Sequence, residues 1–355
     1  MKRRVTLNDI ARELNVTKVT VSKALRDHPD ISEKTRAKVR EVADRIGYKP
    51  NQIARSLTSS KTSTLGVVVP KIAHNFFAHI VDGIQQEANA SGYEILLTVS
   101  EENEVLEKKH IEGLVSMQVD GLLVSVSMET RNTDIYKWIR NTQIPLVFFD
   151  RYIPGLGFNS VVIDDRNAAR NGVNELFRRG CRSVAHLAGY QHVTIGKERR
   201  SGYEEALVDQ GIKPDPKMIV EGGFGEDAGY GGFKELLKRG IIPDGLFTVT
   251  FPVGLGAYMA MRDLAPELMD DIKMLAFGDS GVRGAVPYPQ YFVDQSAHEI
   301  GRKATELLIR EINGDMHPDN HLEYVESKFL QTGWDFLNDL KPDRISHPAD
   351  DGLKL

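Results

Sequence analysis

The chain contains very little cysteine and no long apolar segment. Cys181 is its only cysteine, which excludes an intramolecular disulfide and a cysteine-rich zinc site. We expect this thiol to be a small core residue. No stretch of about 18 apolar residues occurs, and the polar N-terminus lacks the apolar region of a signal peptide. The sequence therefore favours neither membrane insertion nor export, and we expect a cytoplasmic protein.

Motifs of the common enzyme classes are also scarce. The sequence has no P-loop, no nucleophile elbow and no His-Glu-x-x-His pattern, and its ten histidines show no metal-ligand spacing. One loose Gly-x-Gly-x-x-Ala pattern spans residues 223–228, but no ribose-binding acidic residue follows on a strand at the expected distance. We interpret these glycines as a loop before a helix. A dinucleotide-dependent enzyme is the first alternative, but we expect no enzyme, no cofactor and no metal.

Charge is distributed unevenly along the chain. The net charge is −5, yet residues 1–60 contain 14 basic and 7 acidic side chains, and the other 295 residues contain 31 and 43. A basic segment attached to an acidic body is expected of a protein that binds a polyanion at one end. A solvated basic surface would have the same composition, so the motifs must decide between these interpretations.

The basic segment has the pattern of three short helices. Thr6 is a candidate N-cap with an acidic residue three positions later, as in a capping box. Thr17 offers an N-cap to a second helix over residues 18–25, with its apolar side chains turned inward. Ser32 caps a third helix that Gly47 ends. Two helices joined by a tight turn predict a helix-turn-helix domain over residues 1–47.

Side-chain chemistry suggests which residues of this domain contact DNA. The N-terminal part of the second helix enters the major groove in such domains. Lysine can reach guanine O6 and N7, and threonine or valine methyls can contact the thymine methyl. Other polar groups contact phosphates and set the register without reading sequence. The predicted base-reading residues are Thr17, Lys18, Val19, Ser22 and Lys23, and the predicted phosphate contacts are Thr6, Asn8, Thr20 and Lys34.

A short helical pattern follows inside a Ser/Thr-rich linker, over residues 48–62. Pro50 precedes Asn51, a candidate N-cap, and Leu57 is apolar in an otherwise exposed segment. A plain tether is the alternative. The pattern favours a hinge helix that becomes ordered on DNA.

Beyond the linker, short apolar runs alternate with amphipathic segments. Repeated βα units predict parallel sheets covered by helices on both faces. The body is too long for one such sheet, and the pattern divides near residue 162. The predicted strands are 65–70, 95–97, 121–124, 144–150, 161–163, 184–187, 245–249 and 274–277, and the predicted helices include 79–90, 101–118, 168–179 and 199–210.

These motifs resemble the lac repressor/galactose repressor (LacI/GalR) family of transcription regulators. The resemblance rests on Val5-Thr6-Leu7-Asn8-Asp9-Ile10-Ala11, on residues 16–25 and on residues 47–57, and it continues to about residue 335. It implies an all-α helix-turn-helix headpiece and a two-lobed α/β body with parallel sheets, like the type I periplasmic binding proteins. It also implies a repressor at the nucleoid that binds a palindromic DNA operator as a homodimer under the control of a small-molecule effector, such as a sugar.

The resemblance further implies how the chain is divided. The first lobe takes residues 63–161 plus about 293–326, the second takes 162–292 plus about 327–340, and a polar tail covers 341–355. Three crossovers, near 161–164, 290–294 and 325–330, join the lobes. In the family, paired hinge helices enter the minor groove and a leucine matching Leu57 wedges into the central base step. The hinge residues that it places on DNA are Asn51, Ala54, Arg55 and Leu57.

An effector pocket is implied between the lobes, at the C-terminal ends of the strands. Core packing is the alternative for Phe76, Phe77 and Phe224. A lobe–lobe ion pair is the alternative for Arg199. The candidates are Phe76, Phe77, Asp150, Lys197, Arg199, Phe224, Phe251, Asp279 and Gln295.

Two departures from the family affect this pocket. Thr250-Phe251-Pro252 stands where the family commonly has Asn-Asp, and Gly278 stands where it has an aspartate, with Asp279 one residue later. A missing polar partner changes specificity strongly, so a longer saccharide, an anion or no ligand are all alternatives to a small aldose. An extracytoplasmic sugar-binding protein would share this body, but the basic headpiece and the missing signal peptide disfavour it.

Overall fold

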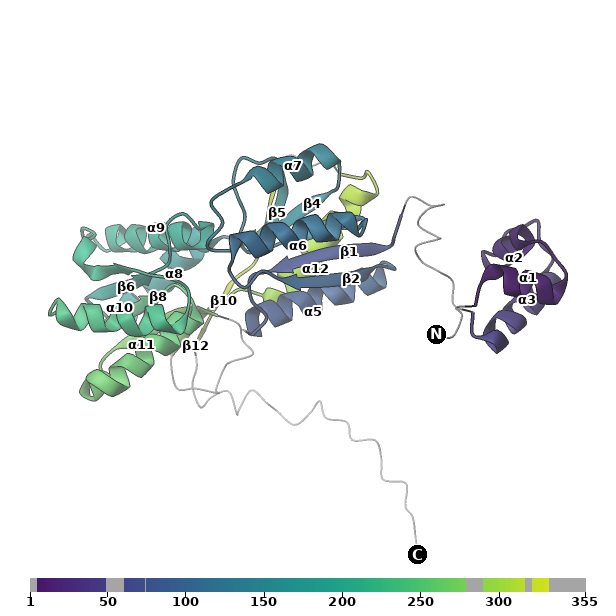
Figure 1. Ribbon diagram of the computed structural model, residues 1–355. Helices are drawn as coiled ribbons and strands as arrows, with labels where there is room; N and C mark the ends of the chain where they lie inside the picture. Colours follow the sequence, from purple (N-terminus) through teal and green to yellow (C-terminus); the bar gives the residue numbers. More distant parts are fainter. Residues whose placement is uncertain (1–4, 49–60, 74, 279–289, 317–320, 332–355) are drawn as a thin grey trace, which may run out of the picture. The chain divides into compact units, whose positions relative to one another are not determined.

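Three helices form the N-terminal part of the structure, a computed structural model that describes residues 5–48, 61–73, 75–278, 290–316 and 321–331 (Figure 1). The chain divides into two compact units between Thr62 and Ser63. In the described residues of the first unit, which we call the headpiece, the helices are α1 (Leu7–Leu14), α2 (Lys18–Leu25) and α3 (Glu33–Ile46).

The predicted helix caps of the headpiece are confirmed. The Asp9 carboxylate accepts hydrogen bonds from the Thr6 amide and hydroxyl, each at 2.8 Å. The Thr17 hydroxyl accepts the Thr20 amide at 3.1 Å, and Gly47 ends α3 with φ at 71°. These groups satisfy backbone amides and carbonyls that a helix end leaves free. The apolar faces close over one small core, made of Ile10, Ala11, Val21, Ala24, Val39, Val42 and Ala43.

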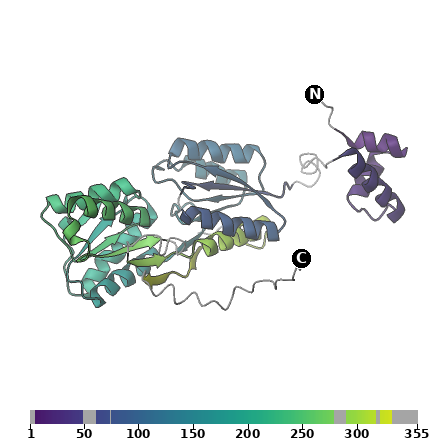
Figure 2. The same ribbon diagram turned by 90° about the horizontal axis from the view of Figure 1, so that it is seen from below.

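The second unit contains two six-stranded sheets, each with helices on both faces (Figure 2). The first sheet has the strand order β11-β5-β4-β3-β1-β2, and its neighbours are parallel. Its strands are β1 (Thr64–Val69), β2 (Glu94–Val99), β3 (Gly121–Val124), β4 (Leu146–Phe149), β5 (Asn159–Ile163) and β11 (Leu322–Val325). It packs with α5 (Asn75–Ala90), α6 (Glu104–Ser116), α7 (Asp134–Thr142) and α12 (Ala297–Ile312), and together these elements are called the first lobe.

The second sheet has the order β12-β10-β9-β8-β6-β7, and β12 alone in that order is antiparallel to its neighbour. Its strands are β6 (Val184–Ala188), β7 (Ile219–Glu221), β8 (Gly245–Thr248), β9 (Lys273–Gly278), β10 (Tyr291–Asp294) and β12 (Lys328–Gln331). It packs with α8 (Asp165–Arg178), α9 (Thr194–Asp209), α10 (Glu226–Lys238) and α11 (Phe251–Leu264), and together these form the second lobe. Two short 3₁₀ turns, Pro216–Met218 and Pro266–Leu268, lie in its connections.

Alternating side chains divide each sheet between two apolar cores. In β1, Val67 and Val69 pack with α5 and α12, whereas Val68 packs with α6 and α7. In the second lobe, α8 and α9 cover one face and α10 and α11 cover the other. Cys181 is buried in the core, as expected, and burial raises the pKa of its thiol to about 11. The predicted fold class, parallel sheets with helices on both faces, is confirmed.

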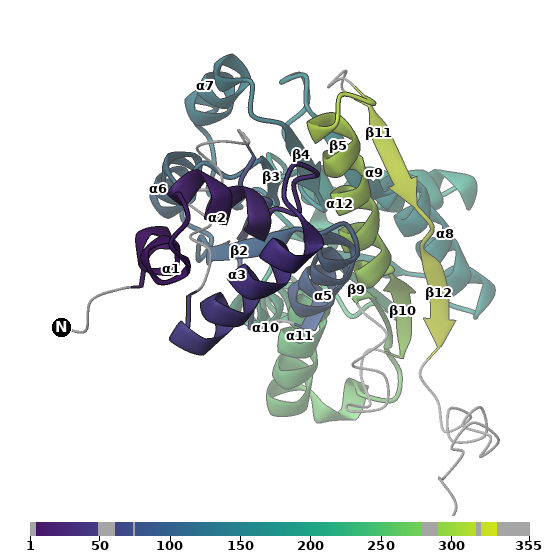
Figure 3. The same ribbon diagram turned by 90° about the vertical axis from the view of Figure 1, so that its right-hand side faces the viewer.

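The chain passes between the sheets three times. It leaves the first sheet after β5, returns after β10, and leaves again after β11. Figure 3 shows β11 and β12 following one another from one sheet to the next. Three neighbouring connections permit the lobes to move relative to one another by small changes in backbone dihedral angles.

Three helices begin earlier than predicted, and α8 does so by three residues, at Asp165. Helix α5 starts at Asn75, four residues before the predicted start, so Phe76 and Phe77 lie in its first turn. Helix α9 starts at Thr194, five residues before the predicted start. Its first residues are two β-branched side chains and Gly196, which have low helix propensity. The glycine is required because a Cβ there would lie 2.3 Å from the Tyr190 carbonyl oxygen.

Within the described residues, no helix combines the length and apolar character that crossing a bilayer requires.

His186 in β6 predicts loss of stability in acid. Its ring lies fully buried against Phe247, with centroids 4.4 Å apart, and its Nδ1 donates to the Phe247 carbonyl at 3.0 Å. Burial lowers its pKa from 6.5 to about 3. A depressed histidine pKa contributes stability above pH 6.5 that is lost as the pH falls toward the folded-state pKa, about 2 kcal/mol by pH 5.

The test is urea unfolding of the wild type and of His186→Phe, which keeps a flat ring, at pH 7.5 and 5.0. We expect the wild type to lose about 2 kcal/mol more than the variant on acidification. Equal losses would show that His186 is not the titrating group.

Candidate functional site

The N-terminal end of α2 presents the predicted base-reading side chains to solvent. Thr17, Lys18 and Val19 are exposed, and Val19 is 63% exposed. An apolar side chain this exposed on a small domain is available for contact with a partner, such as the methyl of a thymine. The predicted phosphate contacts Asn8 and Lys34 are also exposed.

Several predicted DNA contacts have partners within the headpiece. The Lys23 ammonium lies 2.8 Å from Asp30. The Ser22 hydroxyl accepts a hydrogen bond from the Arg26 guanidinium at 2.9 Å. Arg26 therefore lies beside the predicted DNA-contacting residues of α2, although it was not predicted from the sequence. Its position four residues after Ser22 on a helix was the available signal.

The other predicted DNA-contacting residues fall into three groups. Thr17 and Thr20 share a hydroxyl–hydroxyl hydrogen bond of 2.9 Å. Among the described residues, Lys18 and Lys34 have no acidic partner. The hinge candidates Asn51, Ala54, Arg55 and Leu57 lie outside the described residues.

A cavity of about 250 Å³ lies between the two lobes, at the C-terminal ends of the strands. This is where open parallel sheets bind ligands. The sequence-predicted residues that line it are Phe76, Phe77, Asp150, Arg199, Phe224, Phe251 and Gln295.

Lys197, a predicted effector-binding residue, lies away from the cavity. The side chain is exposed and does not line the cavity, whereas Ile195 and Arg199 of the same helix do. Residues four apart share a helix face and a residue midway between them points away. Because α9 begins at Thr194, Lys197 lies on the far face. Asp279 lies outside the described residues.

Aromatic rings form much of the cavity wall. Phe76 and Phe77 come from the first turn of α5 and meet edge to face at 5.3 Å. Phe224 precedes α10 and is held against Gly189, where a Cβ would lie 2.1 Å from its ring. Phe77 and Phe224 also belong to the apolar cores, so each ring both packs in a core and lines the cavity.

Arg199 is a buried cation at the base of the cavity. It is 1% exposed and donates to Asp165 at 2.7 Å, to the Val249 carbonyl at 2.6 Å and to the Gln295 side-chain oxygen at 2.7 Å. Burial raises the pKa of Asp165 to about 6, although the arginine opposes this. Asp165 lies in α8, so this ion pair lies within the second lobe and does not join the two lobes.

Asp150 occupies a strained turn directly after β4. Its φ is 59°, and the Arg151 amide donates to the Phe149 carbonyl at 2.6 Å. A two-residue hydrogen bond around a residue with positive φ is the rare, strained kind of γ-turn. Such strain persists where surrounding contacts enforce it, commonly at functional sites.

The Asp150 carboxylate has weak partners. One oxygen accepts the Ser125 hydroxyl at 3.4 Å and lies 3.7 Å from the Arg151 Nε, and the other has no hydrogen bond from the described residues. Burial raises its pKa above the usual value. A buried carboxylate with an open oxygen can accept a hydrogen bond from a ligand hydroxyl.

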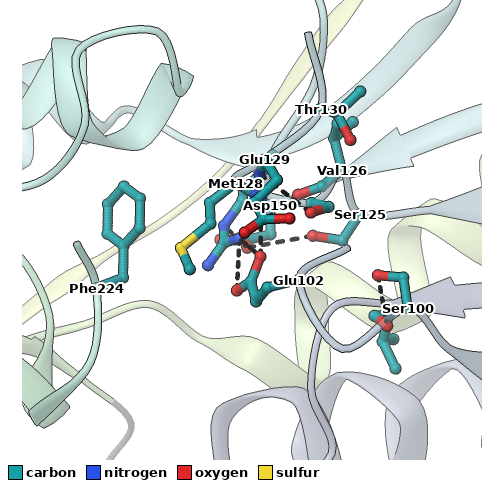
Figure 4. A network of polar contacts seen from close by, with 12 residues as sticks. Ser100, Glu102, Ser125, Val126, Met128, Glu129, Thr130, Asp150 and Phe224 are labelled. Carbon is teal, nitrogen blue, oxygen red and sulfur yellow. Dashed lines mark hydrogen bonds and ion pairs between the residues drawn. The ribbon is translucent and has the colours of Figure 1, made fainter. Parts of the chain in front are cut away.

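Glu102 and Arg151 complete the site and were missed by the sequence reasoning. The Arg151 Nη1 donates to both Glu102 oxygens at 2.9 Å, and both side chains are buried. Glu102 has a φ of 60°, which turns it inward after β2. Charged residues within three positions of the end of an apolar strand were the available signal for each residue, although not for their pairing. Figure 4 shows Glu102 and Asp150 on one side of the network, with Phe224 facing them.

Comparisons with known proteins agree with this two-part architecture. Residues 6–51 match the family described as "Bacterial regulatory proteins, lacI family", and residues 62–329 match "Periplasmic binding proteins and sugar binding domain of LacI family". The chain is 30% identical to catabolite control protein A of Priestia megaterium over 310 residues, covering 87% of this chain and 93% of that protein. It is 29% identical over 309 residues to the transcriptional repressor CytR of Escherichia coli K12, covering 87% and 90%.

Solved structures extend the likeness to the fold. A transcriptional regulator CelR–cellobiose complex is 27% identical with a TM-score of 0.69, over 93% of this chain and all of that one. A lac repressor dimer bound to operator and the anti-inducer ONPF is 23% identical with a TM-score of 0.81, over 93% and 99%. The matches cover the headpiece and the body, so this chain belongs to the LacI family of bacterial transcription regulators.

Proposed function

We propose that this protein is a repressor that binds a palindromic DNA operator as a homodimer and is controlled by a saccharide in the cavity between its lobes. It acts in the cytoplasm, on the nucleoid. One observation carries the effector part: a cavity with aromatic faces also contains an open carboxylate oxygen, at Asp150.

The chemistry of the cavity suits a polyhydroxylated ring. The C–H faces of a sugar can lie on rings of the cavity wall such as Phe76 and Phe251, while a hydroxyl donates to Asp150. The Gln295 side-chain nitrogen has no partner among the described residues and can donate to another ring oxygen. A cavity of about 250 Å³ favours a compact ligand such as a monosaccharide.

The proposed division of labour follows the predicted boundaries. Residues 1–47 read DNA, with Lys18 and Val19 facing bases and Lys34 a phosphate. Residues 48–62 supply the hinge, and Leu57 inserts into the minor groove. The first lobe (63–161 plus about 293–326) and the second lobe (162–292 plus about 327–340) enclose the effector.

Control follows from differential binding. An effector that binds one lobe arrangement better shifts the lobe equilibrium, and the arrangement of the lobes sets how two headpieces meet DNA. Coupling of this kind amounts to about 1–3 kcal/mol in typical systems.

A thermal-shift screen of the full-length protein against monosaccharides, disaccharides and their phosphorylated derivatives tests the effector assignment. A saccharide at about 100 times its Kd stabilises the folded state by about 2.7 kcal/mol and raises the melting temperature. If only phosphorylated compounds raise the melting temperature, the effector is an anionic sugar derivative and not a neutral sugar. No shift with any saccharide would reject the proposed effector class.

A further inference from the structure

The two lobes are linked across the cavity by side chains of the chain itself. Arg151, in the first lobe, stacks on Phe224 of the second lobe, with the guanidinium carbon 5.1 Å from the ring centroid. His192 of the second lobe lies with its Nε2 2.6 Å from the Met128 carbonyl oxygen of the first lobe. Neither link requires an atom of a ligand.

Arg151 contacts three side chains: Glu102, Phe77 and, in the second lobe, Phe224. Glu102 accepts its Nη1 at 2.9 Å, and the Phe77 centroid lies 5.9 Å from its guanidinium carbon. The side chain is therefore placed between one ring from each lobe. Stacking on an aromatic face is a property of the planar guanidinium that an ammonium does not share in full.

Phe224 is an equally fixed partner. Its ring touches the backbone at Gly189, where no side chain fits, and Tyr190 packs edge-on against it at 6.1 Å. Two rigid partners lose little conformational freedom when they meet. The contact between Arg151 and Phe224 therefore joins the lobes at a defined distance.

The second link depends on the same glutamate. Glu102 accepts the Met128 amide at 2.8 Å, and the Met128 side chain packs against the core of the second lobe. The segment that carries Met128 is fastened further along, because Glu107 accepts the Ser127 amide at 2.5 Å. Glu107 is itself buried and accepts the Tyr136 hydroxyl at 2.6 Å. One carboxylate, Glu102, thus positions both links.

We propose that Arg151, positioned by Glu102, is a clamp that holds the two lobes closed before an effector binds. The inference deepens the proposed function, on which its regulatory meaning rests. An effector then enters a cleft that must first open, so the strength of the clamp sets how readily the protein responds.

The test is the lobe-to-lobe distance in the full-length protein, without DNA or effector. Spin labels are attached at Lys109→Cys on α6 and Lys234→Cys on α10, which are exposed on different lobes. The native Cys181 is buried and its thiol pKa is raised to about 11, so it stays unlabelled. Pulsed electron–electron double resonance then gives the distribution of distances between the two spin labels.

Arg151→Lys keeps the charge beside Glu102 but removes the planar stacking group. We expect this variant to lengthen the mean distance by more than about 2 Å, a change of the size seen when domains rearrange. The double variant Glu102→Gln/Arg151→Met removes the buried pair as a unit and is expected to lengthen it as well. Melting curves establish that each variant is folded.

Arg179→Lys is the matched control. Arg179 also pairs with a glutamate, Glu175 at 3.0 Å, and stacks on two rings, Tyr291 at 4.7 Å and Phe329 at 5.8 Å. All of these partners belong to the second lobe, so its replacement should leave the distance unchanged.

Unchanged distances in both Arg151 variants, or equal lengthening in the control, would overturn the clamp. Such a result would reject the clamp but would not bear on the proposed saccharide effector. A saccharide screen without any hit would reject that effector but would not bear on the measured lobe-to-lobe distance.

Discussion

Replacing Arg199 with methionine is expected to lower the free energy of unfolding by about 3–5 kcal/mol, measured by urea denaturation at pH 7.5. The substitution leaves the Asp165 carboxylate buried without its 2.7 Å partner. It also removes the donors to the Val249 carbonyl and to Gln295, at 2.6 and 2.7 Å. Loss of one member of a buried pair costs more than loss of both, because the remaining charge is uncompensated.

The double variant Asp165→Asn/Arg199→Met provides the control, and it should regain at least about half of the lost stability. The loss in Arg199→Met should also depend on pH. The pKa of Asp165 is already raised to about 6, and a carboxyl whose folded pKa is raised contributes stability at low pH that is lost as the pH rises through that value. The single variant should therefore be less destabilised at pH 5 than at pH 7.5. A double variant no more stable than the single one would show that the pair is not the cause.

Asp150→Asn is expected to weaken saccharide binding by about 10- to 100-fold, as measured by calorimetry with a compound found in the screen. The carboxylate offers acceptor oxygens to ligand hydroxyls, whereas an amide turns one of these positions into a donor. Asparagine tolerates positive φ, so the strained turn at 59° is retained.

Stability separates this effect from a structural one. Burial raises the pKa of Asp150, which means that the charged form is disfavoured in the folded state. The neutral amide should therefore leave the melting temperature of the ligand-free protein equal or higher. Unchanged saccharide affinity in a folded Asp150→Asn protein would remove this residue from the proposed site.

The headpiece was predictable because its signals are local. Thr6, Thr17 and Ser32 cap helices through hydrogen bonds within three residues, and Gly47 ends α3 through its own backbone conformation. Short-range rules of this kind can be read from adjacent letters. Eight strands of the body were predictable for a related reason, since buried parallel strands are short runs of apolar residues. The short strands β7, β10, β11 and β12 were not among the predicted strands.

Other features depended on contacts between distant residues. The start of α9 was missed because Gly196 is needed for packing against Tyr190, which overrides its low helix propensity. Lys197 was assigned from the family resemblance alone, and the helical spacing of α9 places it on an exposed face, away from Ile195 and Arg199.

Only part of the cavity lining was predicted from the sequence. The aromatic rings and Asp150 were found through their places after strands, as the family resemblance implied. The pairing of Glu102 with Arg151 joins residues 49 positions apart, and both Glu102 and the Asp150 that precedes Arg151 have positive φ, which is uncommon outside glycine. No local pattern indicates such a pairing.

Sequence-specific DNA binding with two-fold symmetry is tested most directly by selection from random duplex DNA with the full-length protein. We predict enrichment of a pseudo-palindrome with half-sites about one helical turn apart. Lys18→Ala should relax preference at one position in each half-site, whereas Lys34→Ala, the matched control, should weaken binding to all sequences roughly equally. Enrichment of no palindrome by the folded wild-type protein would contradict the account.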